Sequence, residues 1–419
     1  MPYKSFPLLT CKPKNSFLKE ISFEEDKEIL KVTAIPKPVI IRHAHKKPLM
    51  DDAIDWVIKG AVVLWIENTV KEAQNTFDYF NLKLKGKEIG LLHSRFIIED
   101  RSDLEKYWIN KLGKTGDREG GGLLITTQVG EQSLDIDSDI LYTSLCPSDM
   151  MIQRIGRLWR HRNNDKNRPL KEPVISWFAD DLREQANKIN SPRDLFEFKK
   201  GWGLSSYVYE PYILCRTMDV WINKNSVIIP DEIRDVLEST YSPTENYKYL
   251  QEIVKDKNKK YEFMAREATN VNSVFNERAS YEQDLDEQEM LDDPDSLDFT
   301  RLGFDTKKVC LLNTGKTDMV CTINGQSASY LDKDCFCSTC IGYRACIKAN
   351  IHNATISLPM SVWKALGNNI KERIPGDKYT LTLFMKLKGN CWVPIDNNTG
   401  KEIPNHYYDN KRGWIHEKY

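Results

Sequence analysis

The sequence predicts an α/β protein in which a lobe built on a parallel sheet is followed by a helical linker and a small β-rich C-terminal domain. Over residues 1–200, short β-branched runs alternate with polar stretches of helical spacing, a pattern typical of parallel strands covered by helices. Over residues 201–298 the pattern is helical and rich in aromatic side chains, and over residues 299–419 it returns to strand-like alternation. We therefore predict three domains with these boundaries.

The length and composition of the chain exclude several classes of protein. Its 419 residues suggest two or three domains of about 150 residues each. The formal net charge is -1, so any contact with nucleic acid requires a local cationic patch rather than a global basic field. The sequence has no run of 18 apolar residues, and its ten cysteines accompany no export signal. We expect a cytoplasmic protein with reduced thiols and no membrane partner.

The predicted elements of the first domain follow one another in a regular order. Strands are expected at residues 29–35, 61–66, 89–92, 122–126 and 140–144, and helices at 51–59, 69–80, 103–112 and 147–158. Thr69 is followed three residues later by Glu72, which is the spacing of a capping box and predicts a helix N-terminus. Ser148 is predicted to cap the last of these helices.

The second and third domains are predicted from a change of pattern. Helices are expected at residues 231–241 and 245–260, and residues 282–298 then carry nine acidic side chains and no basic one. A block of like charge is typical of a solvated linker, so this segment marks a domain boundary. Beyond it, residues 309–312, 319–323, 354–358 and 379–387 are expected to form strands.

A cluster of cysteines lies in the third domain. Cys335, Cys337, Cys340 and Cys346 place four thiols within twelve residues, which is enough for a tetrahedral zinc ion. Their spacing lacks the paired Cys-x-x-Cys arrangement of zinc knuckles, so unpaired thiols are the favoured interpretation and structural zinc is the alternative. We predict no metal site in the chain.

Residues 153–162, Gln-Arg-Ile-Gly-Arg-Leu-Trp-Arg-His-Arg, form the most informative segment. Arg154, Arg157 and Arg160 recur every three residues, and on a helix they would form one slanting cationic row. Guanidinium groups at this spacing suit bidentate capture of a triphosphate. A solvated basic helix is the alternative.

Polar segments also follow three of the predicted strands. Asn68 and Thr69 follow 61–66, His93, Ser94 and Arg95 follow 89–92, and Thr127 and Gln128 open the segment 127–137. Open α/β sheets bind ligands at the carboxyl ends of their strands, and free backbone N–H groups at a strand-to-helix junction favour phosphate. The alternatives are a turn at Asp135 and Asp137, a surface histidine at His93 and a salt-bridged Arg95.

Taken in order, these four segments resemble the second RecA-like lobe of superfamily 2 helicases. More narrowly, they resemble the signature helicase–nuclease of type I CRISPR–Cas systems, and the likeness rests on residues 91–96, 127–137 and 153–161. It continues in Val-Tyr-Glu-Pro at 208–211, in Arg-Thr at 216–217, in 229–241 and in Thr-Arg-Leu-Gly at 300–303. The resemblance implies a second RecA-like lobe at 1–200, a helical connector ending in an acidic linker at 201–298 and an accessory C-terminal domain at 299–419.

The resemblance also implies a role for each matching residue. Arg157 and Arg160 would be catalytic arginine fingers, and Gln153, Arg154 and Asp135 would bind ATP. Single-stranded DNA would run along Asn68, Thr69, His93, Ser94, Arg95, Thr127 and Gln128. Gly130 departs from the bulkier residue that the family pattern leads us to expect.

Two parts of a complete motor are not found in the sequence. The Gly-Lys-Thr triplets at Gly113 and Gly315 lack the upstream glycine of a phosphate-binding loop. Asp231-Glu232 follows no predicted apolar strand and is interpreted as a helix start after Pro230. The seven histidines include no His-Asp pair of a metal-dependent nuclease. We therefore expect ATP and Mg²⁺ to be used only together with a separate first RecA-like lobe.

The expected function is that of the C-terminal part of an ATP-dependent DNA helicase, a hydrolase of CRISPR interference. Expected partners are single-stranded DNA, an N-terminal half with the first helicase lobe and the nuclease, and the CRISPR RNA-guided surveillance complex. By itself this chain is expected to be inactive as an ATPase. The alternative is a stand-alone nucleic-acid-binding or regulatory module without ATPase activity.

Overall fold

A computed structural model describes residues 37–132, 134–257, 306–313, 321–326, 328, 343–366, 381–396 and 399–417. The chain divides into two units, which are described separately. The first unit comprises Met1–Asp52, Asp139–Trp159 and Lys166–Leu302, and the second comprises Ala53–Ser138, Arg160–Asp165 and Gly303–Tyr419. The predicted strand at 29–35, the acidic segment 282–298 and three of the clustered cysteines (Cys335, Cys337 and Cys340) lie outside the described residues. The predicted domain boundaries stay predictions.

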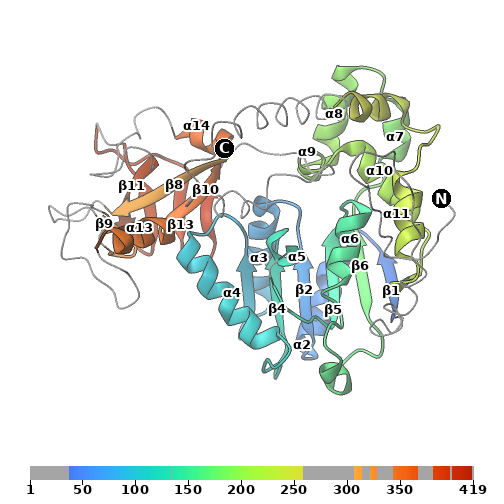
Figure 1. Cartoon of the computed structure of the whole chain (residues 1–419), viewed down its shortest axis with the longest axis horizontal. Coiled ribbons are helices and arrows are strands. Elements are labelled where there is room, and N and C mark those ends of the chain that lie inside the picture. Colours follow the sequence, from blue (N-terminus) through green and yellow to red (C-terminus); the bar gives the residue numbers. More distant parts are fainter. Residues whose placement is uncertain are drawn as a thin grey trace, which may run out of the picture. The chain divides into compact units, whose positions relative to one another are not determined.

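The first unit contains a mostly parallel set of four strands (Figure 1). These are β1 (Lys37–His43), β5 (Ile140–Ser144), β6 (Val174–Phe178) and β7 (Ser226–Ile229), in the order β5-β6-β1-β7. β5, β6 and β1 are parallel, and β7 pairs with β1 in the antiparallel sense. Only β5 was predicted. The sequence analysis missed β6, although every residue of this strand is buried.

The helices of the first unit follow the strands along the chain. They are α2 (Lys46–Ile58), which continues into the second unit, α6 (Ser148–Ile155), α7 (Arg183–Lys188), α8 (Pro192–Trp202), α9 (Ser205–Val208), α10 (Pro211–Trp221) and α11 (Ile233–Tyr241), with a 3-10 helix, η1 (Arg162–Asn167), at a boundary of the units. Ser148 does not cap α6, because Pro147 occupies the N-cap position. The buried Ser148 hydroxyl instead accepts from the Trp221 indole at 2.9 Å and bonds to Thr240 at 2.6 Å, which joins α6 to α10 and α11.

A strand and a helix flank Pro230. β7 ends at Ile229, so the expectation that no strand precedes Asp231-Glu232 is wrong. The predicted helix start is confirmed, since α11 begins at Ile233 with Glu232 as its N-cap residue. The Glu232 carboxylate accepts from the Ile228 backbone N–H at 2.9 Å, which ties the strand to the helix.

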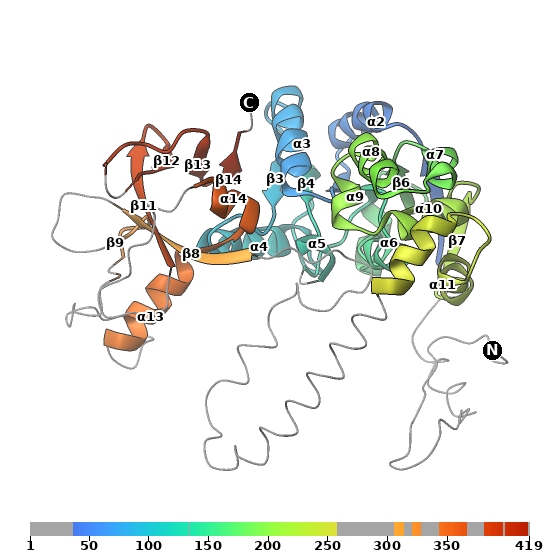
Figure 2. The same cartoon turned by 90° about the horizontal axis from the view of Figure 1, so that it is seen from above.

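The second unit contains three parallel strands that were all predicted. They are β2 (Val62–Ile66), β3 (Ile89–Leu92) and β4 (Gly122–Thr126), in the order β3-β4-β2. The helices α3 (Val70–Lys83) and α4 (Ile98–Leu112) lie on opposite faces of β3 and β4, and the short α5 (Val129–Gln132) follows β4 (Figure 2). The predicted cap of α3 is confirmed, because Thr69 Oγ1 accepts from the Glu72 N–H at 3.2 Å.

The C-terminal part of the second unit forms a separate β-sheet. Its strands are β8 (Thr306–Asn313), β9 (Cys321–Thr322), β10 (Thr355–Pro359), β11 (Leu381–Lys388), β12 (Cys391–Pro394), β13 (His406–Asp409) and β14 (Gly413–His416), with helices α13 (Tyr343–Asn353) and α14 (Met360–Ala365). The order is β10-β8-β11-β12-β13-β14, with β9 paired to β8. The predicted β-rich C-terminal region is confirmed. Ile97, the residue before α4, packs into the core of this sheet beside Tyr408 and Trp414.

No helix in the described parts of the chain combines the length and the apolar character needed to cross a lipid bilayer. The cores of both units are instead built from short buried elements. In the second unit, Trp108 of α4 packs across Gly90 of β3. A Cβ atom at residue 90 would lie 2.2 Å from a ring carbon of Trp108. Gly90 is therefore the residue that admits the indole ring.

We predict that Gly90→Ala lowers the stability of the chain because its methyl group overlaps the buried Trp108 ring. The expected loss in the free energy of unfolding is about 1–3 kcal/mol, measured by thermal or urea denaturation. Gly201→Ala is the matched control, since nothing lies within 4 Å of its added Cβ and alanine favours a helix. If both variants unfold like the parent chain, Trp108 is free to move and the packing argument fails.

Candidate nucleotide and DNA site

The carboxyl ends of β2, β3 and β4 meet at one edge of the second unit. Ile66 and Leu92 are both paired with Thr126, so the three strands end at the same level. Backbone hydrogen bonds continue past the strand ends, from Glu67 N–H to the Thr126 carbonyl at 2.9 Å and from Thr127 N–H to the Leu92 carbonyl at 3.3 Å. The predicted polar segments after these strands are therefore brought together.

Four of the predicted DNA contacts are buried or hydrogen-bonded within the protein, namely Asn68, Thr69, Thr127 and Gln128. Asn68 and Thr127 are each 2% exposed, and the Gln128 side-chain amide donates to the Asn68 carbonyl at 2.9 Å. The Thr69 hydroxyl accepts from the Glu72 N–H and donates to the Glu72 carboxylate at 2.7 Å. These polar groups hold the loops after β2 and β4 in one conformation, and the Gln128 side chain is half-buried.

Gly130 lies at the start of α5, directly beneath the end of β4. A Cβ atom there would lie 2.5 Å from the Thr126 methyl carbon. The threonine methyl group thus fills the space that the expected bulkier residue would need. The contact with Thr126 therefore explains why residue 130 is a glycine.

His93 lies at the end of β3 and is fully buried. Its Nδ1 accepts from the Arg95 N–H at 3.1 Å, so the proton of the neutral ring lies on Nε2, which donates to the Arg412 carbonyl at 3.0 Å. Burial lowers the pKa of His93 to about 3, and the ring is therefore neutral at physiological pH. The sequence alone could not indicate that His93 is buried, because its partner Arg412 lies 319 positions away in the chain.

Ser94 and Arg95 are the predicted DNA contacts that remain accessible. Ser94 is exposed and Arg95 is half-buried. Burial lowers the pKa of Arg95 to about 10, and in the part of the chain that the structure describes no carboxylate pairs with its guanidinium group. A desolvated cation without a counter-charge is costly unless an anion binds to it. Arg95 is therefore a candidate phosphate ligand.

Asp135 and Arg160 are brought together in the second unit. Arg160 Nε donates to Asp135 Oδ1 at 2.7 Å, and His161 Nε2 lies 3.1 Å from the same oxygen. The side chains of Arg160 and Asp135 are 41% and 52% exposed, so solvent screens this ion pair and a stronger anion can compete for Arg160. The predicted arginine finger and the predicted ribose contact are thus partners in this structure.

Asp137 ends the segment 127–137, and the sequence analysis assigned it no role and gave a turn as the alternative. Its carboxylate is fully buried and accepts from the Arg160 N–H at 2.8 Å and from the Asn164 side chain at 2.6 Å. The Arg118 guanidinium lies 3.3 Å away from it. The second aspartate of Asp-x-Asp, followed by an arginine- and asparagine-rich segment at 160–164, was the available signal. Asp137 fixes the backbone from which Arg160 projects.

The predicted cationic row on one helix is wrong. α6 ends at Ile155, and Gly156 is its C-cap residue, so Arg157 and Arg160 lie beyond the helix. Trp159 has a left-handed backbone with φ 49°, and its indole donates to the Asp139 carbonyl at 2.9 Å. This turn changes the direction of the chain, so the three arginines do not lie on one face of a helix despite their three-residue spacing.

The residues around the end of α6 differ in exposure. Gln153 is exposed, whereas Arg157 is 8% exposed and Arg154 is fully buried. Arg154 donates to Thr143 Oγ1 at 2.5 Å and to the Ser144 carbonyl at 3.0 Å, which ties α6 to the end of β5. Gln153, Arg154 and Arg157 belong to the first unit, whereas the other predicted site residues belong to the second.

Among the described residues, no group of three or more histidine, cysteine, aspartate or glutamate side chains is arranged to hold a metal ion. Cys346 of the cysteine cluster is described, and it is buried in α13. Its three companions lie outside the described residues, so the interpretation of the cluster stays a prediction.

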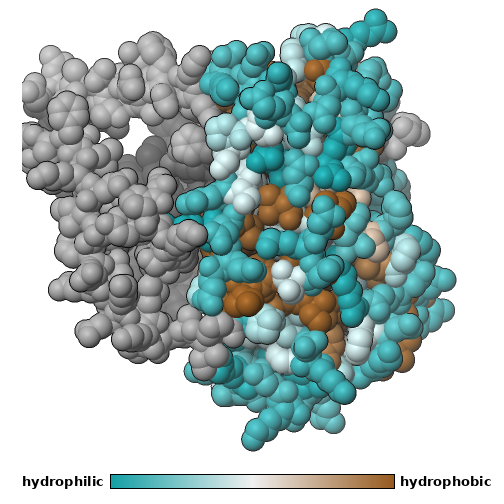
Figure 3. All heavy atoms as spheres, turned by 90° about the vertical axis from the view of Figure 1, so that its right-hand side faces the viewer, coloured by the Kyte–Doolittle hydropathy of each residue, from teal (hydrophilic) through white to brown (hydrophobic). Residues whose placement is uncertain are grey.

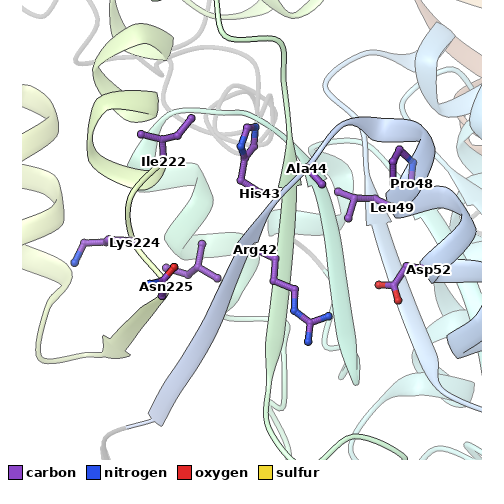
Figure 4. A pocket seen from close by; sticks show the side chains of 10 residues that line it. Arg42, His43, Ala44, Pro48, Leu49, Asp52, Ile222, Lys224 and Asn225 are labelled. Carbon is purple, nitrogen blue, oxygen red and sulfur yellow. The ribbon is translucent and has the colours of Figure 1, made fainter.

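A cavity of about 610 Å³ lies in the first unit at the carboxyl end of β1 (Figure 4). Its lining combines apolar Leu49 and Ile222 with basic Arg42 and Lys224, and His43 of the same strand stacks on Trp177 at 4.0 Å. Figure 3 shows apolar side chains grouped between hydrophilic ones on one face of the molecule. None of the predicted site residues lines this cavity.

Comparison with known proteins finds similarity to CRISPR-associated nuclease/helicases. Residues 59–163 match the family model described as the C-terminal part of the CRISPR-associated nuclease/helicase Cas3. The CRISPR-associated nuclease/helicase Cas3 of Streptococcus thermophilus is 34% identical over 206 residues, which cover 49% of this chain and 20% of that protein. The matched segment therefore spans about a fifth of the relative's length.

Two solved structures share the fold. The crystal structure of T. fusca Cas3-AMPPNP has a TM-score of 0.60 and 20% identity, and the match covers 93% of this chain and 44% of that chain. A chain of a CRISPR RNA-guided surveillance complex, pre-nicking, has a TM-score of 0.58 and 21% identity, with 90% and 44% covered. The predicted resemblance and the predicted α/β fold are thereby confirmed.

We predict that Asp137→Ala loosens the segment that carries Arg160, because the Arg118 cation and the Arg160 N–H lose their buried acceptor. Removing one partner of a buried ion pair costs about 3–5 kcal/mol, and amide hydrogen exchange over residues 160–165 should accelerate accordingly. Asp103→Ala, at a largely exposed aspartate, is the control and should leave exchange there unchanged. Equal exchange in both variants would contradict the role given to Asp137.

Proposed function

We propose that this chain, which corresponds to the C-terminal half of the Cas3 superfamily 2 helicases, supplies the second RecA-like lobe of an ATP-dependent DNA helicase in CRISPR interference. The relatives are named as nuclease/helicases, which supports a helicase-type enzyme. The observation that carries the proposal is Arg95, a half-buried guanidinium without a carboxylate partner in the described residues, at the joined ends of three parallel strands.

The DNA strand is proposed to contact the edge formed by the ends of β2, β3 and β4. The Arg95 guanidinium and the exposed Ser94 hydroxyl would bind backbone phosphates, whereas the Gln128 amide, which donates to the Asn68 carbonyl, would hold the loop after β4. Asn68, Thr69 and Thr127 would shape the loops rather than contact the strand, because their polar groups are buried or engaged. Contacts to phosphate give affinity without base reading, as a translocating motor requires.

The nucleotide part of the proposal concerns Arg160. Its guanidinium is accessible and its ion pair with Asp135 is screened by solvent, so it is able to exchange that carboxylate for phosphoryl oxygens. ATP with Mg²⁺ would supply the transferred phosphoryl group. Arg160, with Arg157, would stabilise the negative charge that spreads over its oxygens, and Asp135 would be released for the ribose. Gln153, exposed on α6, would contact the same phosphates.

Further partners follow from the relatives. The similarity to a T. fusca Cas3-AMPPNP structure supports nucleotide binding, and the similarity to a chain of a surveillance complex supports docking to such a complex. We propose that a first RecA-like lobe and a nuclease domain complete the enzyme. This chain by itself should bind DNA but hydrolyse no ATP.

Arg95→Ala is expected to weaken binding of a labelled single-stranded oligonucleotide by the 419-residue chain. Loss of one phosphate contact should reduce the slope of log affinity against log salt by about 0.7. The measurement is fluorescence anisotropy at several salt concentrations. Arg101→Ala removes the same charge from nearby α4, where Arg101 pairs with Glu105, and should leave the slope unchanged. An unchanged slope for Arg95→Ala would refute the proposed DNA edge.

Arg160→Ala is expected to reduce DNA-stimulated ATP turnover by about 10³-fold in an assembly that supplies a first RecA-like lobe with a phosphate-binding loop. The loss arises because Arg157 alone would leave part of the charge on the transferred phosphoryl oxygens without a cationic partner. Steady-state phosphate release is the measurement, and Arg162→Ala at the exposed neighbouring arginine is the control. Turnover of Arg160→Ala at the parent rate would show that Arg160 is not an arginine finger and would refute the proposed role in ATP hydrolysis.

A further inference from the structure

The hairpin of β13 and β14 lies directly against the loop that carries Arg95. The Trp414 N–H donates to the Arg95 carbonyl at 2.7 Å. On the other side, the Arg95 N–H donates to His93 Nδ1, and His93 Nε2 donates to the Arg412 carbonyl. Both backbone polar groups of Arg95 are therefore held by the hairpin, one directly and one through the imidazole ring.

Gln74 fixes the hairpin from α3. Its side chain is 3% exposed, and its Nε2 donates to the Arg412 carbonyl at 2.8 Å and to the Trp414 carbonyl at 2.9 Å. A primary amide offers two N–H groups, so one glutamine satisfies both acceptors. The Arg412 carbonyl thus receives hydrogen bonds from Gln74 and His93 together.

Gly413 allows the hairpin turn to approach this closely. Its φ of +67° lies in the left-handed region, and a Cβ atom would lie 2.4 Å from the Arg95 carbonyl oxygen and 2.7 Å from a ring carbon of His93. Glycine alone meets both demands. The Arg412 side chain adds an ion pair with Asp78 of α3 at 3.2 Å, which anchors the turn laterally.

A second contact of the hairpin lies at the far end of the same loop, beyond Arg95 and next to α4. The Tyr408 hydroxyl of β13 accepts from the Ile97 N–H at 3.2 Å and donates to the Asp100 carboxylate of α4. This contact joins the same two parts of the second unit, but it touches none of residues 93–95. It therefore provides a comparison for the contacts around Gln74.

We propose that Gln74 and His93 are positioning residues, which hold the Arg95 loop in its DNA-binding conformation through the turn at Arg412–Trp414. The inference rests on the proposed function, in which Arg95 binds a DNA phosphate. A loop that is ordered before binding loses less conformational freedom when DNA binds, so the affinity for single-stranded DNA is higher. The C-terminal sheet thus raises DNA affinity through its hydrogen bonds to the Arg95 loop. The buried His93 orders this loop and does not contact the DNA.

The test compares two variants that each remove polar contacts of the same hairpin. Gln74→Met keeps the length of the side chain and removes both donors, and the dissociation constant for a labelled single-stranded oligonucleotide should rise about five- to tenfold. The salt slope should fall as it does for Arg95→Ala. Tyr408→Phe removes only the contact with Ile97 and Asp100, and affinity should stay at the parent value. Circular dichroism and thermal denaturation establish that each chain is folded.

A double-mutant cycle separates positioning from general weakening. In the Arg95→Ala background, Gln74→Met should have no further effect, because it acts through Arg95. Additive losses, or equal losses from Gln74→Met and Tyr408→Phe, would overturn the inference. If Gln74→Met fails to fold, Gly413→Ala provides the second variant with the same expected direction. An unchanged affinity for Arg95→Ala would instead refute the proposed function, and an effect of Arg95→Ala without one of Gln74→Met would refute positioning alone.

Discussion

The buried carboxylate of Asp137 is the constraint on which the arginine segment of the second unit depends. A charge that is removed from water must find donors nearby, and Asp137 finds them in the Arg160 N–H, the Asn164 amide and the Arg118 guanidinium. These bonds place the Arg160 backbone where no regular helix holds it. The exposed side chain makes a weaker, screened ion pair with Asp135. The Arg160 backbone is held by Asp137, whereas its side chain can exchange Asp135 for another anion. A side chain arranged in this way reaches a ligand from a fixed position and can still leave its ion pair.

The same division of labour recurs at the ends of β2, β3 and β4. Asn68, Thr127 and His93 are buried. The Asn68 carbonyl accepts from the Gln128 amide, the Thr127 N–H donates to the Leu92 carbonyl, and the His93 ring bonds to the backbone of Arg95 and Arg412. Only Ser94 and Arg95 combine access with a polar or cationic group that is not needed for the loops. Motif resemblance selects all of these residues together, because all of them stand at the same strand ends. Burial and hydrogen bonding then separate those that shape the site from those that face a ligand.

Local patterns in the sequence predicted local structure well. β2, β3, β4 and β5 were predicted from short apolar runs, and the Thr69 cap from its spacing to Glu72. The sequence analysis missed β6, although this strand is an apolar run as fully buried as β2, β4 and β5. It extended α6 because the arginine spacing mimics a helical period. The family resemblance assigned His93 to DNA, and nothing near it in the sequence indicates that the residue is buried. Its partner Arg412 belongs to another sheet, and only the assembled second unit brings the two together.

The long separation between His93 and Arg412 also bears on when the loop becomes ordered during synthesis. The contact closes a loop of 319 residues, and contacts of such span form late because chain entropy opposes them until other structure has formed. Residues 93–95 leave the ribosome well before residue 412, yet the groups that complete their hydrogen bonding are translated near residue 412. A nascent chain that has not reached this residue would thus contain the arginine without its ordered setting. Maturation of this edge of the protein is tied to translation of the β13–β14 hairpin.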